Sequence, residues 1–206
     1  EGIVDPIFIG NKALTLQYAL ELGFQIKPES IIDEPNDAAA SKLAVSLIRE
    51  GKADLLMKGM VTTAVLLKAV LDKENGLRVG DTLSHLAVFE SPYYHKLIGV
   101  TDAAMNVAPE FHEKVAIINN AVEAMRGIGI DKPKIAIIGP VEVVNPKIES
   151  TVHAAMLTQM NRRGQIANCL IDGPLALDNA VSKEACAQKK IVTEVGGDAD
   201  ILVAPE

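Results

Sequence analysis

The sequence predicts an α/β protein of two lobes, each built on a mainly parallel sheet with helices, and three observations support this fold class. Short apolar runs alternate with amphipathic helical patterns up to residue 71, and a second alternating series begins near Lys134. Between the two series, a pair of β-like runs separated by a short segment suits a hairpin, which adds an antiparallel strand. Alternation of strand and helix is the pattern of a parallel sheet covered on both faces.

Composition limits the possible partners. The chain has 206 residues and a net charge of −7, and 49% of its residues are hydrophobic but only 3% are aromatic. The core must therefore be aliphatic. The negative charge argues against nucleic acid or an anionic membrane surface as the main partner, because their phosphates repel an acidic chain. No apolar run approaches the roughly 18 residues of a membrane span, so we expect a soluble protein.

The two cysteines are too few to indicate a disulfide framework or a zinc site. Free thiols suit a reducing cytoplasm, and we interpret Cys169 as a core residue of a strand. The histidines show no spacing suited to a metal, so we predict no metal site. Two of them lie on predicted helices and are expected to face solvent, namely His112 and His153.

The N-terminal elements are predicted in order. A strand over 3–10 is followed by a helix over 13–22 that ends at Gly23, and a second strand lies within 26–33. Asn36 or Asp37 can cap the next helix, which closes at Gly51. Its apolar residues fall at helical spacing, at Ala40, Leu43, Ala44, Leu47 and Ile48.

The stretch over 53–71 is the one around which we expect the fold to be organised. A short buried strand over 54–57 precedes Lys58 and Gly59, and Thr62 and Thr63 can cap a helix over 64–71. A glycine turn, the free N–H groups of a helix start and a lysine together suit an anion such as phosphate. The alternative is an ordinary strand-to-helix turn with the lysine solvated at its rim.

The middle of the chain predicts a hairpin and a long helix. Two β runs cover 84–90 and 96–101, a loop follows over 102–109, and Pro109 is placed to open the helix over 111–126. The connector after this helix suggests a domain boundary within 108–134. We therefore divide the chain into a first lobe, 1–108, and a second lobe, 109–206.

The second series alternates again. Strands are predicted over 134–139, 167–171 and 198–205, and helices over 148–160 and 180–190. The loops that follow the strands carry polar residues, as functional loops of α/β sheets commonly do. These loops, read together, are more specific than any one of them.

Four segments resemble the phosphate acetyl/butyryltransferase family, and its butyryl branch more than its acetyl branch. They are MKGMVTT at 57–63, TDAAMNVAP at 101–109, VEVVNPKIEST at 141–151 and IDGPLALDNAVS at 171–182. The resemblance implies an enzyme that moves a short-chain or branched acyl group between coenzyme A and inorganic phosphate. It further implies a fold similar to the isocitrate and isopropylmalate dehydrogenases, with a cleft between two lobes, a homodimer, and coenzyme A as a substrate rather than a bound cofactor.

The family pattern extends beyond this sequence. Family members usually open with one further strand and helix and continue past the segment that matches ADILVAPE. The later part carries a serine, an arginine and an acidic residue to which phosphate binding and thiol activation are attributed. Both lobes are therefore expected to be incomplete here, and the chain by itself is expected not to turn over.

The reaction that the resemblance implies needs a cation for phosphate, donors for the carbonyl oxygen, and a base for the thiol. Lys58, the amide after Gly59, Thr62 and Thr63 could receive the phosphoryl group. Asn106 could donate to the carbonyl oxygen, Asp102 would orient a neighbour, and Thr101 and Asp102 are candidates for binding phosphate or substrate. Such residues are also frequent turn formers that bond their own backbone, so this alternative stays open.

Two later loops supply further candidates. Glu142, Asn145 and Lys147 follow the strand over 134–139, although Asn145 is equally well explained as a helix cap before a proline. Asp172, Gly173 and Asp178 follow the next strand. Asp178 is a candidate catalytic group, and its alternative role is to cap the following helix.

Two other functions compete with this interpretation. A metal- and nicotinamide-dependent hydroxy acid dehydrogenase of the similar fold would need a cluster of aspartate ligands, which the sequence does not offer. A non-catalytic piece that binds coenzyme A, or that only assembles with itself, is favoured by the missing C-terminal part.

Overall fold

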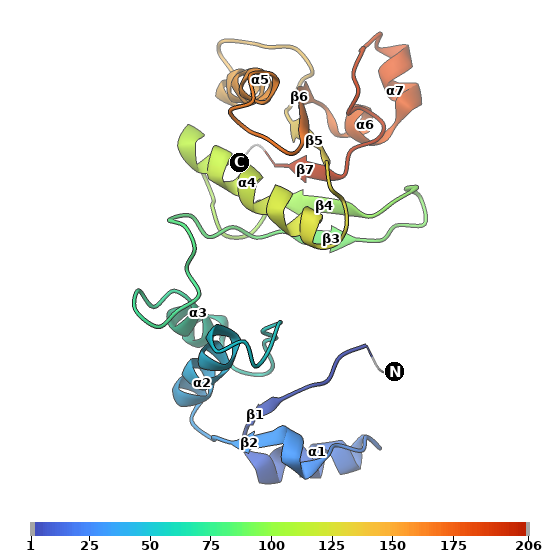
Figure 1. Cartoon of the computed structure of the whole chain (residues 1–206). Coiled ribbons are helices and arrows are strands. Elements are labelled where there is room, and N and C mark those ends of the chain that lie inside the picture. The colour runs from blue at the N-terminus through green and yellow to red at the C-terminus, as the bar shows by residue number, and fades with distance from the viewer. Residues whose placement is uncertain (1–2, 205–206) are drawn as a thin grey trace. The chain divides into compact units, whose positions relative to one another are not determined.

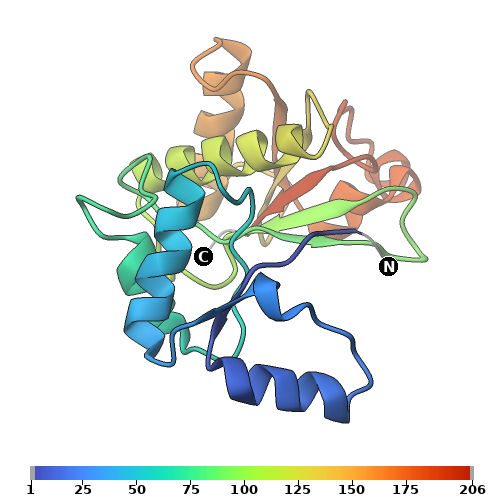
Figure 2. The same ribbon diagram turned by 60° about the horizontal axis from the view of Figure 1, so that its bottom comes forward.

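The computed structural model describes residues 3–204 and divides into two compact units, one ending at Asp81 and one beginning at Thr82. Figure 1 shows both units with their elements labelled, and Figure 2 shows them turned. Each unit is described by itself. Together they establish an α/β fold whose strands are mainly parallel.

The N-terminal unit holds a two-stranded parallel sheet and three α-helices among its described residues. Strand β1 pairs with β2 in the register Phe8↔Ile31. The elements are β1 Phe8–Gly10, α1 Lys12–Glu21, the 3₁₀ helix Pro28–Ser30, β2 Ile31–Asp33, α2 Asp37–Arg49 and α3 Thr63–Val70. The strands predicted over 3–10 and 26–33 are thus confirmed in their last residues, and the predicted helices in nearly their whole length.

Helix α2 shows why these helices were predictable. The side chain of Asn36 accepts hydrogen bonds from the N–H groups of Ala38 and Ala39, as an N-cap residue does. Beyond its end, Gly51 has φ +66°, a conformation that glycine adopts without steric cost. Helix α1 ends in the same way, with Gly23 at φ +72°.

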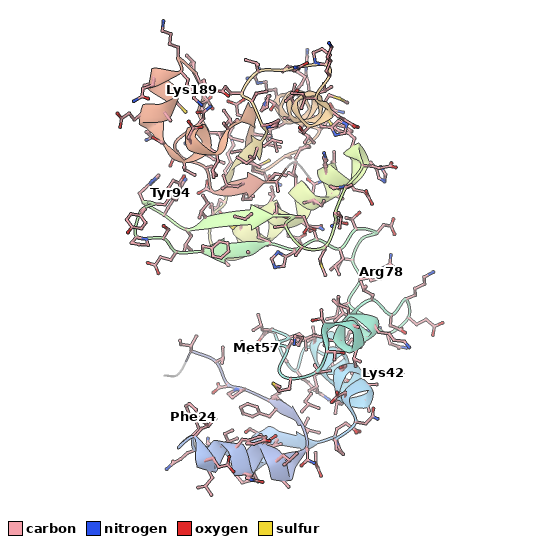
Figure 3. The ribbon with its side chains drawn as sticks, turned by 180° about the vertical axis from the view of Figure 1, so that it is seen from behind. Phe24, Lys42, Met57, Arg78, Tyr94 and Lys189 are labelled. Carbon is pink, nitrogen blue, oxygen red and sulfur yellow. The ribbon has the colours of Figure 1, made fainter. Side chains whose placement is uncertain are left out.

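The prediction of a strand over 54–57 is wrong. The structure has no strand there, and Leu55 and Met57 are 71% and 84% exposed. Figure 3 labels Met57 on the irregular segment that precedes α3. No neighbouring strand pairs with this segment, so its apolar residues do not become part of a sheet.

The C-terminal unit is organised around a five-stranded sheet in the order β3-β4-β7-β5-β6. Strands β3 and β4 form the predicted antiparallel hairpin, and all other neighbours are parallel. The elements are β3 Ala87–Phe89, β4 Ile98–Thr101, α4 Phe111–Gly127, β5 Lys134–Ile138, α5 Glu149–Arg162, β6 Leu170–Leu175, α6 Leu177–Val181, α7 Lys183–Gln188 and β7 Ile201–Val203.

Alternating residues of the central strands fill two cores, one on each face of this sheet. Ile135 and Ile137 of β5 pack with helices α4 and α5 on one face, where the buried residues include Ile118, Met125, Ala154 and Leu157. Ala136, between them in the sequence, faces the other core with Ala180 of α6. This is the three-layer arrangement expected for a parallel sheet, and Figure 1 shows helices on both sides of it.

The two compact units, divided along the chain between Asp81 and Thr82, differ from the predicted lobes 1–108 and 109–206. Strand β4, which the prediction gave to the first lobe, pairs with β7 in the register Gly99↔Ile201, and β7 pairs in turn with β5. The hairpin therefore shares one sheet with the strands assigned to the second lobe. As a description of the lobes of a complete family member, the division at 108 stays a prediction.

Several boundaries in the C-terminal unit need correction. Strand β6 continues through Asp172, Gly173 and Pro174, which we expected to form a loop after it. The single helix predicted over 180–190 is two helices, α6 and α7, separated at Ser182. Pro109 precedes the N-cap residue of α4, Glu110, rather than occupying its first turn.

The predicted core and surface residues are mostly placed as expected. Cys169 is buried, both cysteines are free thiols, and the side chain of His112 is 77% exposed. His153 was expected to face solvent, which is wrong: its side chain is only 15% exposed, and its ring centroid lies 5.1 Å from that of Phe111. Within residues 3–204, no helix is long and apolar enough to cross a membrane.

An ion-pair network joins three strands at the amino edge of the large sheet. Asp198 accepts hydrogen bonds from Lys134 Nζ at 2.6 Å and contacts Lys96 Nζ at 3.0 Å, and His95 lies 2.8 Å away. Asp200 also contacts Lys96, at 2.8 Å. The hydrogen bond from Lys134, together with those from His95 and Lys96, holds the pKa of Asp198 well below its usual range, although burial acts against this.

Candidate active site

The parallel strands of the C-terminal unit bring several predicted site residues to one edge of the sheet. Strands β4, β7, β5 and β6 run in the same direction, so their carboxyl ends share that edge. The loop over 102–110 follows β4, the loop over 139–148 follows β5, and α6 follows β6. Ligands of open α/β sheets commonly bind at this edge.

Asp102 organises the loop after β4. Its residue is only 6% exposed, and its Oδ1 accepts hydrogen bonds from the N–H groups of Ala104 and Met105, at 3.0 and 2.9 Å. Its Oδ2 accepts from the N–H of His85 at 3.2 Å and from Asn106 Nδ2 at 2.5 Å. Burial would raise the pKa of Asp102, but these donors together hold that pKa below its usual value. Asp102 therefore orients its neighbours.

Asn106 directs its amide inward. Besides its contact to Asp102, Nδ2 donates to the carbonyl oxygen of Leu83 at 3.0 Å. Both amide hydrogens therefore have acceptors, and the loop is tied to the segment that leads into β3. A cavity of about 210 Å³ lies at this loop, lined by Asp102, Ala103, Ala104, Asn106 and Val107.

Thr101 ends strand β4 directly before this loop. It is fully buried, and its Oγ1 has no hydrogen-bond partner among the described residues. A buried hydroxyl without a partner is uncommon in native structures. Its backbone carbonyl accepts from the N–H of Ala204 at 2.7 Å, which continues the pairing with β7.

Glu142 and Asp178 come together through a residue that sequence reasoning missed, Lys189. The Nζ of Lys189 lies 2.9 Å from Glu142 Oε1 and 3.0 Å from Asp178 Oδ2. Its hydrogen bonds lower the pKa of both carboxyl groups, and those same bonds raise the pKa of Lys189. Both carboxylates are therefore held ionised, and Asp178 is a weaker base than an ordinary aspartate.

Asn179 is a second residue that sequence reasoning missed. It is fully buried in α6, and neither polar atom of its amide has a hydrogen-bond partner of ordinary geometry among the described residues. The amide nevertheless acts on Glu142, as a minor contribution after Lys189 to the lowered pKa of that carboxyl. The only sequence signal was its position within the motif IDGPLALDNAVS.

Asn145 and Lys147 lie in the second half of the loop after β5. The cap of α5 is Ile148, so the predicted capping role of Asn145 is wrong. Instead, its Oδ1 accepts from the N–H of Lys147 at 3.0 Å, and its own N–H donates to Thr151 Oγ1 at 2.9 Å. Lys147 is exposed.

Asp172 and Gly173 lie inside β6 and not after it. Asp172 Oδ1 accepts from the N–H of Gly173 at 2.9 Å. A Cβ at position 173 would lie 2.8 Å from the Cβ of Ile137 and 2.9 Å from its carbonyl oxygen. Packing against β5 therefore requires glycine here, whatever else this residue does.

The predicted anion site of the N-terminal unit has a closed hydrogen-bond arrangement of its own. Lys58 Nζ donates to the carbonyl oxygens of Gly59 and Val61, both at 3.0 Å. Thr62 caps α3 by accepting from the N–H of Val65, and Thr63 is the first residue of the helix. Within residues 3–204, no group of three or more His, Cys, Asp or Glu side chains is arranged to hold a metal ion.

The fold and the polar carboxyl edge define an α/β protein of the kind that binds its ligands on loops after parallel strands. Comparison with known proteins makes this specific. The sequence profile of the phosphate acetyl/butaryl transferase family matches residues 26–206, and the chain belongs to this family.

Similar proteins agree with this assignment. The chain is 48% identical to the phosphate butyryltransferase of Clostridium acetobutylicum over 204 residues, which cover 99% of the chain and 68% of that protein. It is 54% identical to the probable phosphate butyryltransferase of Bacillus subtilis over 166 residues, 81% of the chain and 56% of that protein. The crystal structure of a branched-chain phosphotransacylase from Enterococcus faecalis matches with a TM-score of 0.80 and 34% identity, covering 98% of this chain and 79% of that one.

Proposed function

We propose that the protein is a phosphate acyltransferase that moves a short-chain or branched acyl group between coenzyme A and inorganic phosphate. The observation that carries this proposal is the family match over residues 26–206, together with the identity to proteins named phosphate butyryltransferase. The loops at the carboxyl edge of the large sheet support it, because they place polar side chains where such folds bind ligands.

The proposed chemistry is a direct displacement at a carbonyl carbon. The thiolate sulfur of coenzyme A forms a bond to the carbonyl carbon of the acyl phosphate, and the carbonyl oxygen becomes negative. The bond from that carbon to the phosphate oxygen then breaks, and inorganic phosphate leaves with the electron pair. The thiol proton goes to a base. No covalent acyl-enzyme is required.

We assign the donor role to Asn106. It gives up its contact to the carbonyl oxygen of Leu83, which is longer than its contact to Asp102, and donates that hydrogen to the substrate oxygen. Asp102 holds the amide in place and keeps the loop closed around the cavity. Thr101, whose Oγ1 has no partner among the described residues, offers a second donor, a hydroxyl group, beside this loop.

Phosphate binding is proposed for cationic and amide groups. Lys147 is exposed in the loop after β5, and Lys58, the amide after Gly59, Thr62 and Thr63 form the corresponding candidate of the N-terminal unit. Asp178 was predicted to be catalytic. Since its ion pair to Lys189 lowers its pKa, we assign it to holding that lysine rather than to taking the thiol proton.

The wider properties follow from the family. We propose that coenzyme A is a substrate and not a bound cofactor, that the protein acts in the cytoplasm, and that it forms a homodimer. The two-lobed arrangement similar to the isocitrate dehydrogenases, with the substrates in a cleft between the lobes, stays a prediction. So do the substrate-binding roles of Glu142, Asn145, Asp172 and Gly173.

The test measures release of the coenzyme A thiol from butyryl-coenzyme A by the whole protein, with and without inorganic phosphate. We expect release that depends on phosphate. Asn106→Ala should lower kcat by about a hundredfold, as loss of one oxyanion donor does, whereas Asn119→Ala on the exposed surface of α4 should stay near the unmodified rate. Binding of coenzyme A without any phosphate-dependent release would contradict the proposal and favour the non-catalytic alternative.

A further inference from the structure

Lys189 joins two segments of the carboxyl edge that are far apart in the sequence. It is the C-cap residue of α7, and its Nζ reaches Glu142 in the loop after β5 as well as both carboxylate oxygens of Asp178, at 3.0 and 3.3 Å. Figure 3 labels Lys189 at the end of this helix. A single ammonium thus ties the loop over 139–148 to the pair of helices α6 and α7.

The two halves of that loop are held differently. Thr151 anchors the second half, because its Oγ1 accepts from the N–H of Asn145 at 2.9 Å and donates to the carbonyl oxygen of Ile148 at 2.8 Å. In the first half, Val143 and Val144 are exposed, and within the described residues Glu142 makes the one ion pair of this stretch. Lys189 therefore supplies the charged tether of the first half, beside the minor contribution that the Asn179 amide makes at Glu142.

The charges explain why this tether needs a cation. Glu142 and Asp178 contact the same nitrogen, so two carboxylates would face each other if it were removed. The buried amide of Asn179, which also acts on Glu142, carries no charge and cannot take over the ion pair. Loss of the ammonium should consequently push the loop away from α6.

We propose that Lys189 is a positioning residue of the acyl transfer: it fixes the first half of the loop over 139–148 and so sets the place of the residues that this loop presents at the carboxyl edge. The consequence for catalysis rests on the proposed function. The consequence for the loop does not, because it depends only on the contacts of Lys189.

The first test is hydrogen exchange, in the whole protein, of the backbone amides of Gly139 and Asn145, which flank the first half of the loop and donate to the carbonyl oxygen of Leu175 and to Thr151 Oγ1, both at 2.9 Å. Lys189→Met keeps the length of the side chain and removes its charge, and it should speed exchange by about tenfold or more, since the loop opens locally. Lys190→Met, the matched control, removes a neighbouring charge that makes no ion pair among the described residues, and it should leave the loop unchanged. Glu142→Gln removes the same ion pair from the other side and should reproduce the faster exchange.

The second test measures acyl transfer with the same variants. Lys189→Met should lower kcat/KM by about tenfold to a hundredfold, as misplaced site residues do, and Lys189→Arg should restore most of it because arginine can also bridge two carboxylates. Unchanged exchange at Gly139 and Asn145 in both Lys189→Met and Glu142→Gln would overturn the proposal. If the unmodified protein lacks acyl transfer, the proposed function fails, while the exchange result still decides whether Lys189 fixes the loop.

Discussion

Replacing Asp102 by asparagine tests whether this carboxylate organises the loop after β4. The change turns one of the two oxygens into an NH₂ group. Whichever oxygen is replaced, two of the four donors around it lose their acceptor: either the N–H groups of Ala104 and Met105, or the N–H of His85 and the amide of Asn106. At about 1–2 kcal/mol for each donor left unsatisfied, unfolding should become easier by about 2–4 kcal/mol at pH 7.

The effect should also depend on pH, in a direction that the pKa of Asp102 fixes. That pKa is lowered in the folded protein, so the carboxylate contributes stability above its unfolded pKa of about 3.9 and loses the contribution as the pH falls toward the folded value. Asparagine cannot titrate. The difference between the two proteins should therefore be constant above about pH 5 and should shrink below about pH 4.

Urea unfolding of both proteins, followed by circular dichroism from pH 7 down to pH 3, measures this difference. Asp131→Asn, a change on the exposed surface, is the matched control and should stay within about 0.5 kcal/mol of the unmodified protein. A difference for Asp102→Asn below about 0.5 kcal/mol at pH 7, or one of equal size at every pH, would refute the reasoning.

Three further substitutions have expected outcomes. Gly173→Ala places a Cβ within 2.8 Å of Ile137, so thermal unfolding should show a loss of about 1–3 kcal/mol. Asp198→Asn weakens the contact to Lys134 and its neighbours at the amino edge, with an expected loss of about 1.5–3 kcal/mol in urea unfolding at pH 7. Since the pKa of Asp198 is lowered in the folded protein, this loss should shrink as the pH falls below about 4, the ordinary pKa of the unfolded carboxyl group. Lys58→Met should raise the KM for phosphate in the thiol-release assay more than it lowers kcat, since an exposed cation acts mainly in binding.

Each of these three substitutions has a control variant or an outcome that would contradict the expectation. Gly59→Ala, where nothing lies within 4 Å of the added Cβ, should cost less than Gly173→Ala, and equal losses would contradict the packing argument. For Asp198, an unchanged loss at acid pH would mean that charge is not the cause. For Lys58, the companion variant is Lys68→Met within α3; an equal rise in KM from both would show a general effect of charge rather than a site.

The sequence predicts those elements whose ends carry their own signals. Helix α2 begins at Asn36 and ends before Gly51, and helix α4 has a long apolar repeat, so local chemistry alone fixed their limits. The segment over 53–57 has no such signals. Its apolar residues fit a strand only where a partner strand exists, and none pairs with them.

For strand β6 the prediction fails in the opposite direction, because residues expected to form a loop belong to the strand. Asp172, Gly173 and Pro174 are turn residues in most contexts, yet here they continue the strand. Among residues 3–204, strand β6 pairs with β5 alone, so one of its sides has no neighbour there that needs the missing N–H of proline. The position of a strand within its sheet decides this, and no local pattern reports it.

The residues of the candidate site were likewise predictable only where their contacts are local in the sequence. Asp102 and Asn106 were predictable because they share one short loop at a strand end. Lys189 was not, because a lysine at the end of a helix is ordinarily explained by the helix dipole. Its ion pair to Glu142 joins segments separated by β6 and three helices, a contact that exists only once the sheet is assembled.

The order of the large sheet constrains how the protein is made. Strand β7 lies between β4 and β5, although it is the latest of the five strands to leave the ribosome. Until it emerges, the β3–β4 hairpin and the β5–β6 pair have no strand to join them, and the edges of β4 and β5 that pair with β7 remain unpaired. During synthesis, two separate parts of this sheet therefore exist before the strand that joins them. A chaperone that binds these parts would act mainly in the interval between the synthesis of β6 and that of β7.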